Sequence, residues 1–387
     1  MKPRIAILAS AFDPRLNYQE SVTARTLHRS GYDVRVFTTT APIVRKDISY
    51  PEVDAASGIA ITRSSKFIRI KNTFIPRDPD TVAAIRAFNP ERAILFAPAS
   101  GIGYHWMSAL PASCKVMAFI SDLPWHRTSS LMWWLLKRRW LRAVFKRADA
   151  VAAVTADTET MLRSAGGKLL DGKLLMTGLS YDNAIFGDQP AATPPEVLAL
   201  KARAPRLIAI VTKSAPDKQL DEAITAITSV MAQNPDTGFI LAGITDDACG
   251  LALRNQIAAS PVADRCLALP VLEAPAIKGI FENASCALFS LVSIGIQQAL
   301  ACGCPVILRS GQPASHILKE GTNSSRFDSF SSLPATLLPF LNHPWNRQSI
   351  RDSILPWRSE VVLDRLMSFA DSPLSQRIAA ESSSSPS

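Results

Sequence analysis

The sequence predicts an α/β protein made of two Rossmann-like domains, each with a parallel sheet covered by helices on both faces. Two observations carry this prediction. Short apolar segments alternate with segments of helical length in the first part of the chain. The alternation starts again after residues 187–205, which contain four prolines and little strand character. The length of 387 residues and the hydrophobic content of 47% suit two packed domains.

The first part of the chain begins with a β-α-β unit. An apolar run at residues 4–12 ends before Asp13 and Pro14, and a helical segment at residues 21–29 leads through Gly31 to a strand at residues 33–39. Further apolar segments predict strands at residues 59–62, 93–97, 116–120 and 151–154.

The second part repeats this rhythm. Apolar segments predict strands at residues 206–211, 238–244, 265–270, 286–291 and 304–308, with a helix at residues 218–234. We therefore expect an N-terminal domain at residues 1–185 and a C-terminal domain at residues 186–354. The serine-rich tail at residues 371–387 is expected to be disordered.

Several classes of protein are excluded by composition. No apolar run approaches the roughly 18 to 20 residues of a membrane-spanning helix, and the first residues enter an apolar strand without a signal-peptide core. We therefore expect a cytoplasmic protein. The 6 cysteines form no CxxC pair and have no histidine at zinc-like spacing, which indicates reduced, mostly buried thiols and no metal site.

The positive charge is unevenly distributed. Residues 1–150 hold 23 Lys and Arg against 11 Asp and Glu, whereas residues 151–387 hold 19 against 22. The excess of +12 therefore lies in the first part, and the remainder carries −3. Such asymmetry suggests that the N-terminal domain meets an anionic partner such as a membrane surface or a phosphorylated acceptor. Nucleic acid is not expected, because no stacking-aromatic module or helix-turn-helix pattern accompanies the charge.

Residues 286–321 are the most informative segment of the chain. They predict a buried strand, a tight loop at Ser293, Ile294 and Gly295, a helix that ends at Cys302 and Gly303, and a second buried strand. In an open parallel sheet, ligands bind outside the carboxyl ends of the strands. A helix N-terminus there offers N–H groups and a positive dipole end to an anion such as a pyrophosphate.

This segment resembles the donor-site segment of family 4 glycosyltransferases of the GT-B fold, where the helix reads E-A-M/L-A-C/A-G before P-V-I. The resemblance runs in order over most of the chain, from residue 4 to residue 370. Residues 147–166 resemble the strand and helix that close the N-terminal domain, and residues 176–186 resemble the hinge. The resemblance implies two Rossmann-like domains facing across a central cleft, with a C-terminal helix at residues 355–370 that packs back onto the N-terminal domain.

Two lysines match the family motif G-R-x-x-x-E-K-G, in the sequence VTKSAPDKQLDEAI. Lys213 stands where the family has arginine, and Lys218 stands where it has lysine. The resemblance implies that both point at the donor diphosphate and act as the catalytic cations. Fixed cations stabilise the negative charge that develops on a leaving nucleoside diphosphate. The alternative is that both are solvated charges at the start of a helix.

The family signature of two glutamates eight positions apart is replaced here by Ser290 and Gln298. The resemblance implies that Gln298 lies where a glutamate holds the ribose hydroxyls, and an amide can both donate and accept hydrogen bonds there. Ser290 lies where a glutamate touches the transferred sugar, and it is too small and neutral to act as a general acid. His316 aligns with a further glutamate near the donor, or is a structural histidine.

The acceptor side of the site is expected in the N-terminal domain. The loop after the first strand reads DPRLNYQES, and it places Asn17, Tyr18 and Glu20 where the family has its P-x-x-G-G or Y-Q-E loop. Asp122 falls where the family has H-D at the edge of the cleft, with His126 close behind. Asp122 either orients an acceptor hydroxyl or caps the following helix.

The helix expected at residues 131–147 combines aromatic and basic residues. Trp133, Arg138, Arg139, Trp140 and Arg142 are candidates for a membrane-facing surface, because Trp with basic residues suits an interface of anionic lipids. The alternative is a domain helix whose aromatic face is core and whose cations are solvated.

The leading hypothesis is a glycosyltransferase that moves a sugar from a nucleotide-sugar, UDP- or GDP-linked, to a glycan or polyprenyl-linked acceptor. The resemblance implies that transfer retains the configuration at the anomeric carbon and needs neither a metal nor a cofactor. It also implies a role in polysaccharide biosynthesis at the inner face of the cell membrane. The alternatives are a non-catalytic GT-B subunit that binds a glycan or nucleotide, and a sugar-nucleotide epimerase of similar fold.

Overall fold

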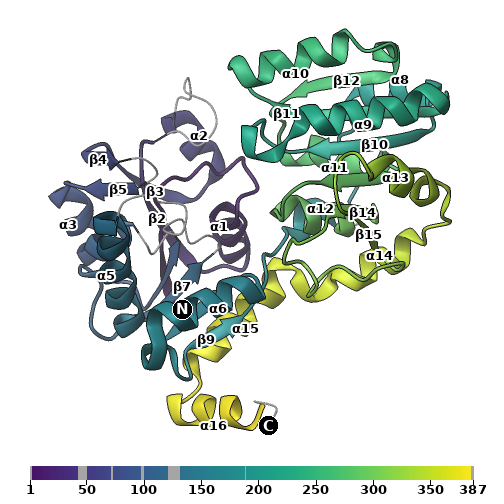
Figure 1. The fold of residues 1–387 in the computed structure, drawn as a ribbon. Helices are drawn as coiled ribbons and strands as arrows, with labels where there is room; N and C mark the ends of the chain where they lie inside the picture. Colours follow the sequence, from purple (N-terminus) through teal and green to yellow (C-terminus); the bar gives the residue numbers. More distant parts are fainter. Residues whose placement is uncertain are drawn as a thin grey trace. The chain divides into compact units, whose positions relative to one another are not determined.

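The computed structural model describes residues 2–41, 50–70, 73–96, 100–120, 131–187 and 189–384. The side chains of residues 69–70, 73–74, 102, 131–134, 379–380 and 382–384 are not part of this description. The chain divides into two compact units, the first comprising Met1–Leu179 with Ser359–Ser387 and the second Ser180–Arg358 (Figure 1). Among the described residues, no helix is long and apolar enough to cross a membrane.

The boundary of the second unit lies at Ser180, earlier than the expected residue 186. The reason is a local pairing of the two chain segments that enter and leave this unit. The Tyr181 N–H donates to the Trp357 carbonyl at 3.1 Å, and Tyr181 forms a parallel bridge with Arg358. Because Tyr181 is also buried in the core of the second unit, residues 180–186 belong to that unit.

The first unit is built on a seven-stranded parallel sheet in the order β3-β2-β1-β6-β7-β8-β9. Its strands are β1 (Arg4–Leu8), β2 (Asp33–Thr39), β3 (Ala60–Ser64), β6 (Arg92–Phe96), β7 (Lys115–Ile120), β8 (Ala150–Ala153) and β9 (Leu174–Met176). A separate antiparallel hairpin joins β4 (Phe67–Ile70) to β5 (Thr73–Pro76). The central strands β1, β6, β7 and β8 are almost wholly buried, as the continuous apolar runs predict for a sheet covered on both faces, whereas the edge strands β3 and β9 are mostly half-buried.

Helices cover both faces of this sheet. One core lies under α1 and α15, and the other lies under α3, α4, α5 and α6. The helices of the unit are α1 (Gln19–Arg29), α2 (Tyr50–Ser57), α3 (Pro79–Phe88), α4 (Gly101–Met107), α5 (Leu131–Arg147), α6 (Ala156–Gly166), α15 (Ser359–Asp371) and α16 (Leu374–Ser384). The expected return of the C-terminal helix to the N-terminal domain is therefore seen in α15, which packs on α1.

The second unit has a six-stranded parallel sheet in the order β12-β11-β10-β13-β14-β15. Its strands are β10 (Arg206–Val211), β11 (Thr237–Ile244), β12 (Cys266–Pro270), β13 (Cys286–Phe289), β14 (Val306–Arg309) and β15 (Ser324–Phe327). Its helices are α7 (Asn183–Phe186), α8 (Pro195–Arg203), α9 (Leu220–Gln233), α10 (Ala248–Ala258), α11 (Ala274–Asn283), α12 (Ile294–Ala301), α13 (Leu333–Asn342) and α14 (Arg347–Ile354). Cores again lie on both faces of the sheet.

Both sheets contain a point where the strand order reverses. In the first unit this point lies between β1 and β6, and in the second between β10 and β13. Loops that leave adjacent strands at such a point run to opposite faces, so a crevice opens at the carboxyl edge of the sheet, where ligands bind in doubly wound folds. The topology therefore predicts ligand sites at the loops after β1 and β6 and at the loops after β10 and β13.

One predicted helix starts later than expected. The helix expected from residue 218 begins at Leu220, because Pro216–Lys218 form a 3-10 turn and Gln219 has a left-handed φ of 49°. The single 3-10 turn changes the direction of the chain before α9. It places Lys218 on the loop that follows β10 instead of on the helix.

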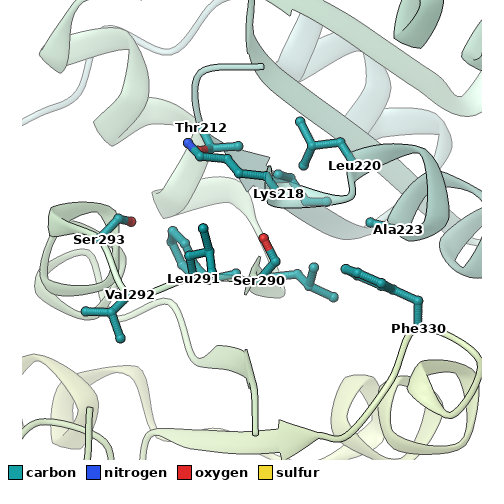
Figure 2. A pocket seen from close by; sticks show the side chains of 12 residues that line it. Thr212, Lys218, Leu220, Ala223, Ser290, Leu291, Val292, Ser293 and Phe330 are labelled. Carbon is teal, nitrogen blue, oxygen red and sulfur yellow. The ribbon is translucent and has the colours of Figure 1, made fainter. Parts of the chain in front are cut away.

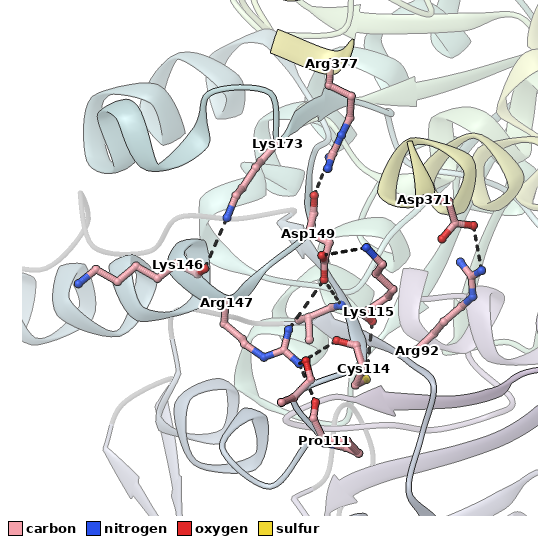
Figure 3. Close-up of polar contacts among 12 residues, drawn as sticks. Arg92, Pro111, Cys114, Lys115, Lys146, Arg147, Asp149, Lys173, Asp371 and Arg377 are labelled. Carbon is pink, nitrogen blue, oxygen red and sulfur yellow. Dashed lines mark hydrogen bonds and ion pairs between the residues drawn. The ribbon is translucent and has the colours of Figure 1, made fainter. Parts of the chain in front are cut away.

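The tail expected to be disordered instead forms α16, which docks on the first unit (Figure 3). Arg377 donates to the Asp149 carbonyl at 2.6 Å, and Glu381 accepts from the Gly172 N–H at 2.8 Å and pairs with Arg163 at 2.6 Å. Ile378 packs against Gly172, and its Cγ1 would lie 2.6 Å from an ideal Cβ built on that glycine. Asp149 and Gly172 lie more than 200 residues before their partners in α16, so the composition of the tail does not predict these contacts.

Candidate functional site

A pocket lies at the point of strand reversal in the second unit, where the loops after β10 and β13 meet (Figure 2). It has a volume of about 140 Å³. The lining comprises Ile210, Thr212, Lys218, Leu220, Ala223, Leu288, Phe289, Ser290, Leu291, Val292, Ser293 and Phe330. This volume is below the roughly 300–1,000 Å³ of complete small-molecule sites, so the pocket suits one part of a ligand, such as a phosphate group.

Among the residues that the structure describes, Lys218 is the one charged residue that lines this pocket. Its ammonium group donates to the Thr212 hydroxyl, and Figure 2 shows the side chain reaching Thr212 over the mouth of the pocket near Ser290. Burial lowers the pKa of Lys218, opposed by the charge of Asp217 and assisted by that of Lys213. Within the described part of the second unit, the ion pairs join other residues, so Lys218 is a partly desolvated cation that forms no direct ion pair.

The loop that carries these groups is fixed to the end of β11. The Thr212 N–H donates to the Ala242 carbonyl at 2.9 Å, and the Ser214 N–H donates to the Gly243 carbonyl at 3.0 Å. Ser214 in turn accepts from the Thr245 N–H at 3.0 Å. Gly243 has a φ of 105°, and a Cβ there would lie 2.2 Å from the Thr212 carbonyl oxygen. Glycine at 243 therefore allows this close approach, which holds the loop in place.

The second wall of the pocket is the loop after β13. Ser290 is 8% exposed and directly follows the strand, and Ser293 precedes the first turn of α12. The Ser293 side chain forms no capping hydrogen bond, so its hydroxyl does not occupy the N–H groups of that turn. The first N–H groups of a helix have no partner within the helix and favour an anion. Gly295 lets α12 start close to Phe289, whose ring lies 2.9 Å from an ideal Cβ.

The predicted donor residues are therefore only partly brought together. Lys218, Ser290 and Ser293 line one pocket, and Ile294 and Gly295 form the adjoining first turn of α12. Lys213 is exposed on the loop after β10 and lies outside the lining, although its charge acts on Lys218. Gln298 is buried further along α12 and also lies outside the lining.

His316 lies apart from the pocket. Its ring centroid is 6.3 Å from that of Trp357, and its buried Nε2 has no hydrogen-bond partner. Burial lowers the pKa of His316. Trp357 is next to the bridge between Tyr181 and Arg358, so His316 lies close to the chain segments that enter and leave the second unit.

The structure adds residues that sequence reasoning did not single out. Thr212 and Phe330 line the pocket, and Arg309 ends β14 beside it. The Arg309 guanidinium donates to the Gln219 side-chain oxygen, and its Cζ lies 5.6 Å from the centre of the Phe330 ring. The available signal was a charged residue at the carboxyl end of an apolar strand.

In the first unit, the predicted acceptor residues follow β1 at the other point of strand reversal. Arg25 fixes this loop by donating to the Pro14 carbonyl at 2.6 Å and the Asn17 side-chain oxygen at 2.5 Å. The Asn17 Nδ2 is buried without a partner. Tyr18 is 37% exposed, and burial of its hydroxyl raises its pKa. Glu20 lies in the first turn of α1, and burial raises its pKa to about 7.

The pKa of Glu20 leads to a prediction for the change Glu20→Gln. Because its pKa is raised, the Glu20 carboxyl binds its proton more tightly in the folded protein than in the unfolded chain. The contribution of this proton to the free energy of unfolding is complete below pH 4.5 and is lost as the pH rises to about 7. Above pH 7 the buried charge lowers the free energy of unfolding by up to about 3 kcal/mol. We expect Glu20→Gln to raise the melting temperature at pH 8 and to leave it nearly unchanged at pH 4.5.

The control for this experiment is Glu196→Gln. Glu196 also lies in the first turn of a helix, α8, but its side chain is exposed. Differential scanning fluorimetry at both pH values should show a pH-dependent gain in melting temperature for Glu20→Gln and not for Glu196→Gln. The same change in melting temperature at pH 4.5 and pH 8 for Glu20→Gln would contradict the buried titration.

The remaining acceptor candidates, Asp122 and His126, lie outside the described residues. The side chain of Trp133, predicted as membrane-facing, also lies outside them.

Trp140, predicted as part of a membrane-facing surface, is instead buried at 8% exposure. It lies on the same side of α5 as Leu141, Val144 and Phe145, which form the core with α4 and α6. Amphipathic spacing identifies the apolar face of a helix but does not show whether a sheet covers it. The opposite face lines a shallow groove of about 460 Å³, formed by Tyr104, Leu135, Arg138, Arg139, Arg142, Ala143 and Lys146.

No protein-family model and no curated protein sequence matches the chain. Solved structures match it over nearly its whole length. Sucrose-phosphate synthase from Thermosynechococcus elongatus has a TM-score of 0.69 at 17% identity, covering 98% of this chain and 100% of that chain. HepE from Anabaena, in complex with UDP-glucose, has a TM-score of 0.68 at 13% identity, covering 95% and 98%.

A third similar structure is named as an epimerase. A putative UDP-N-acetylglucosamine 2-epimerase from Listeria monocytogenes has a TM-score of 0.63 at 13% identity, covering 95% of each chain. At such identities the likeness concerns the fold. The chain has the succession of two Rossmann-like units that these structures share, and the predicted GT-B fold is confirmed.

Proposed function

We propose that this protein is a glycosyltransferase that moves a sugar from a nucleotide-sugar to a glycan or lipid-linked acceptor. The observation that carries the proposal is Lys218, a partly desolvated cation that forms no direct ion pair, in a pocket at the strand reversal of the second unit. Support also comes from the fold, which is shared with HepE in complex with UDP-glucose and with a sucrose-phosphate synthase.

In this proposal the donor diphosphate lies at the pocket of the second unit. Lys218 contacts it from the loop after β10, Lys213 adds a second positive charge from the same loop, and the first turn of α12 supplies N–H groups. Cleavage of the glycosidic bond increases the negative charge on the diphosphate. Donors fixed before the reaction stabilise that charge without reorganisation, which is the largest single contribution in many enzymes.

We further propose that transfer retains the configuration at the anomeric carbon and needs no metal. The bond from the sugar C1 to the phosphate oxygen breaks while the acceptor oxygen bonds to C1 on the same face. The acceptor proton passes to the departing phosphate oxygen, and the nucleoside diphosphate leaves. This route requires no carboxylate at Ser290, whose hydroxyl remains as a hydrogen-bond partner for the sugar.

The acceptor is proposed to bind at the loop after β1 of the first unit. Asn17 presents a buried Nδ2 without a partner, and Glu20 has a carboxyl that titrates near neutral pH. A sugar hydroxyl can accept from the first group and donate to the ionised form of the second. The raised pKa of Glu20 is typical of carboxyls at functional sites.

A panel of sugar nucleotides tests the donor part of the proposal. Thermal shift measurements should compare UDP, GDP, UDP-glucose, UDP-N-acetylglucosamine and GDP-mannose at millimolar concentration. A ligand at 100 times its Kd stabilises the folded state by about 2.7 kcal/mol, so binding gives a clear rise in melting temperature. The absence of a shift with every member of the panel would overturn the proposal.

Two alternatives share this donor pocket and differ in chemistry. A non-catalytic subunit would bind nucleotide-sugar without turnover, and the absence of a carboxylate from the pocket lining favours it. An epimerase would interconvert the sugar without an acceptor, and the Listeria structure favours it. Product analysis by mass spectrometry separates the three: release of nucleoside diphosphate only with an acceptor supports transfer.

We also propose that the basic groove on α5 meets the anionic headgroups of a membrane, which brings the enzyme to a lipid-linked acceptor in cell-envelope glycan synthesis. Arg139, Arg142 and Lys146 are exposed along one side of α5, and Leu135 beside them is 52% exposed. Each basic residue near an anionic surface contributes about 1 kcal/mol. Replacing the three cations with Gln should therefore weaken binding by roughly 100-fold.

Liposome co-sedimentation with phosphatidylglycerol vesicles measures this effect. The control replaces three exposed cations elsewhere on the same unit, Lys66, Arg77 and Arg86, with Gln, so that the change in net charge is identical. Retention should fall only for the α5 variant. Equal retention of the two variants would contradict a docking surface on α5.

A further inference from the structure

Three cations lie at the carboxyl edge of the second sheet. Lys213 and Lys218 follow β10, and Arg309 ends β14. The ion pairs within the described part of the second unit are those of Arg206, Arg254 and Lys278, so none of the three edge cations is neutralised in this way. The diphosphate of a nucleotide-sugar carries about two negative charges, which the two lysines of the loop after β10 can bind.

Three acidic groups lie near these cations: the charge of Asp217 acts on Lys218, and the charge of Lys213 acts on the Asp247 carboxylate. The Asp247 carboxylate caps α10 by accepting from the Gly250 N–H at 2.9 Å. The Glu222 carboxylate accepts from the Gln219 amide at 2.7 Å. Asp217 is exposed on the 3-10 turn beside Lys218. None of these three residues belongs to the pocket lining, whose polar side chains are Thr212, Lys218, Ser290 and Ser293.

Arg309 is held in a defined orientation. The Glu222 carboxylate fixes the Gln219 amide nitrogen, so the Gln219 oxygen is directed to the Arg309 guanidinium. Gln219 adopts a left-handed φ of 49°, a conformation that non-glycine residues seldom adopt and that occurs often at functional sites. The guanidinium also lies against Phe330, which lines the pocket.

The described contacts use one of the five N–H donors of Arg309. The remaining donors form a planar fork that matches a carboxylate in two parallel hydrogen bonds. A lysine or a serine cannot provide this geometry. The polar side chains of the pocket beside Arg309 carry hydroxyl and ammonium groups, which can donate hydrogen bonds to an anionic ligand, and the rest of its lining is apolar.

From the orientation of Arg309 and its unused N–H donors beside the pocket, we propose that the donor is a nucleotide-activated acidic sugar, whose carboxylate is recognised by Arg309. The inference rests on the proposed function, because it names the class of sugar that the same site takes. The two lysines and the first turn of α12 bind the diphosphate. Arg309 then determines specificity by pairing with the third negative charge of the donor.

Matched pairs of donors test this inference by isothermal titration calorimetry. The pairs are UDP-glucose with UDP-glucuronate and GDP-mannose with GDP-mannuronate, with UDP and GDP as references. A charge-assisted pair predicts that the acidic donor of the preferred base binds at least about tenfold more tightly than its neutral partner. Arg309→Met should abolish this preference and change the affinity for the nucleoside diphosphate less than threefold.

A second variant separates charge from geometry. Arg309→Lys keeps the cation but loses the fork, so it should restore only part of the preference for the acidic donor. Equal affinity of the wild-type protein for both members of each pair would overturn the inference while leaving the proposed function intact. An equal loss of affinity for both donors of a pair in Arg309→Met would also overturn the inference, because it would show that Arg309 binds the diphosphate. Failure of UDP and GDP to bind would overturn the proposed function and the inference together.

Discussion

Lys218→Ala is expected to lower kcat/KM for sugar transfer by about 100-fold to 1,000-fold, the effect of removing one preorganised group that stabilises developing charge. Lys218 reaches the pocket from the 3-10 turn and is partly desolvated before any ligand binds. An anion in the pocket therefore meets a cation that needs little reorganisation. Steady-state kinetics with saturating acceptor measures the loss.

The stability of a second variant, Lys218→Met, separates function from folding. Because burial lowers the pKa of Lys218, the folded state disfavours its charged form, and removal of the charge should not destabilise the protein. Lys218→Met is therefore expected to keep or raise the melting temperature in the absence of nucleotide. Activity and stability would then change in opposite directions, as is common for residues of functional sites.

Lys201→Ala is the matched control. Lys201 is also a partly buried lysine of the second unit whose pKa is lowered by burial, but its ammonium group donates to the Asn283 carbonyl at 2.8 Å and lies outside the pocket lining. The control should retain kcat/KM within a few-fold. An unchanged kcat/KM in Lys218→Ala would remove Lys218 from the site.

Gly243→Ala is expected to destabilise the second unit by about 3 kcal/mol or more, since it combines backbone strain with a clash. The φ of 105° disfavours any residue with a side chain, and the new Cβ would lie 2.2 Å from the Thr212 carbonyl oxygen. At about 2–4 °C per kcal/mol, the melting temperature should fall by roughly 6 °C or more. Nucleotide affinity should fall as well, because the displaced loop carries Thr212 and leads to Lys218.

Gly311→Ala provides the comparison for this variant. Gly311 also has a positive φ, of 78°, but an ideal Cβ there meets nothing within 4 Å. We expect a loss of about 1–2 kcal/mol from strain alone, with nucleotide affinity unchanged. Equal losses of stability in the two variants would contradict the view that contact between Gly243 and Thr212 positions the loop.

The strands could be predicted from the sequence because burial on both faces of a parallel sheet requires continuous apolar runs. The segments of β10, β11, β13 and β14 are such runs, and each formed within a few residues of its expected position. The start of α9 was misplaced because the left-handed conformation of Gln219 has no signature in a residue of that type. Here the three-dimensional context overrides local propensity.

The parts that escaped prediction depend on contacts between distant segments. The tail forms α16 because Asp149, Arg163 and Gly172 present partners for it. Trp140 is buried because α4 and α6 pack around α5. Such pairings are set by the topology of the sheet, and amphipathic spacing cannot distinguish a core face from a membrane face.

The pocket was predictable in part. The spacing of residues 286–321 identified the loop after β13 and the start of α12, and the lysine motif identified the loop after β10. The role of Arg309 was not apparent, because its partner Gln219 lies 90 residues earlier in the chain. Gln298 is buried on α12 outside the pocket lining, and its role at the ribose stays a prediction.

Hydrogen–deuterium exchange with and without UDP tests the central claim most directly, namely that a nucleoside diphosphate binds where the loops after β10 and β13 meet. We predict slower exchange at residues 212–219 and 290–296 when UDP is present, and no such change in Lys218→Ala at the same UDP concentration. Binding of UDP without protection of these two segments, or with protection confined to the first unit, would contradict the account.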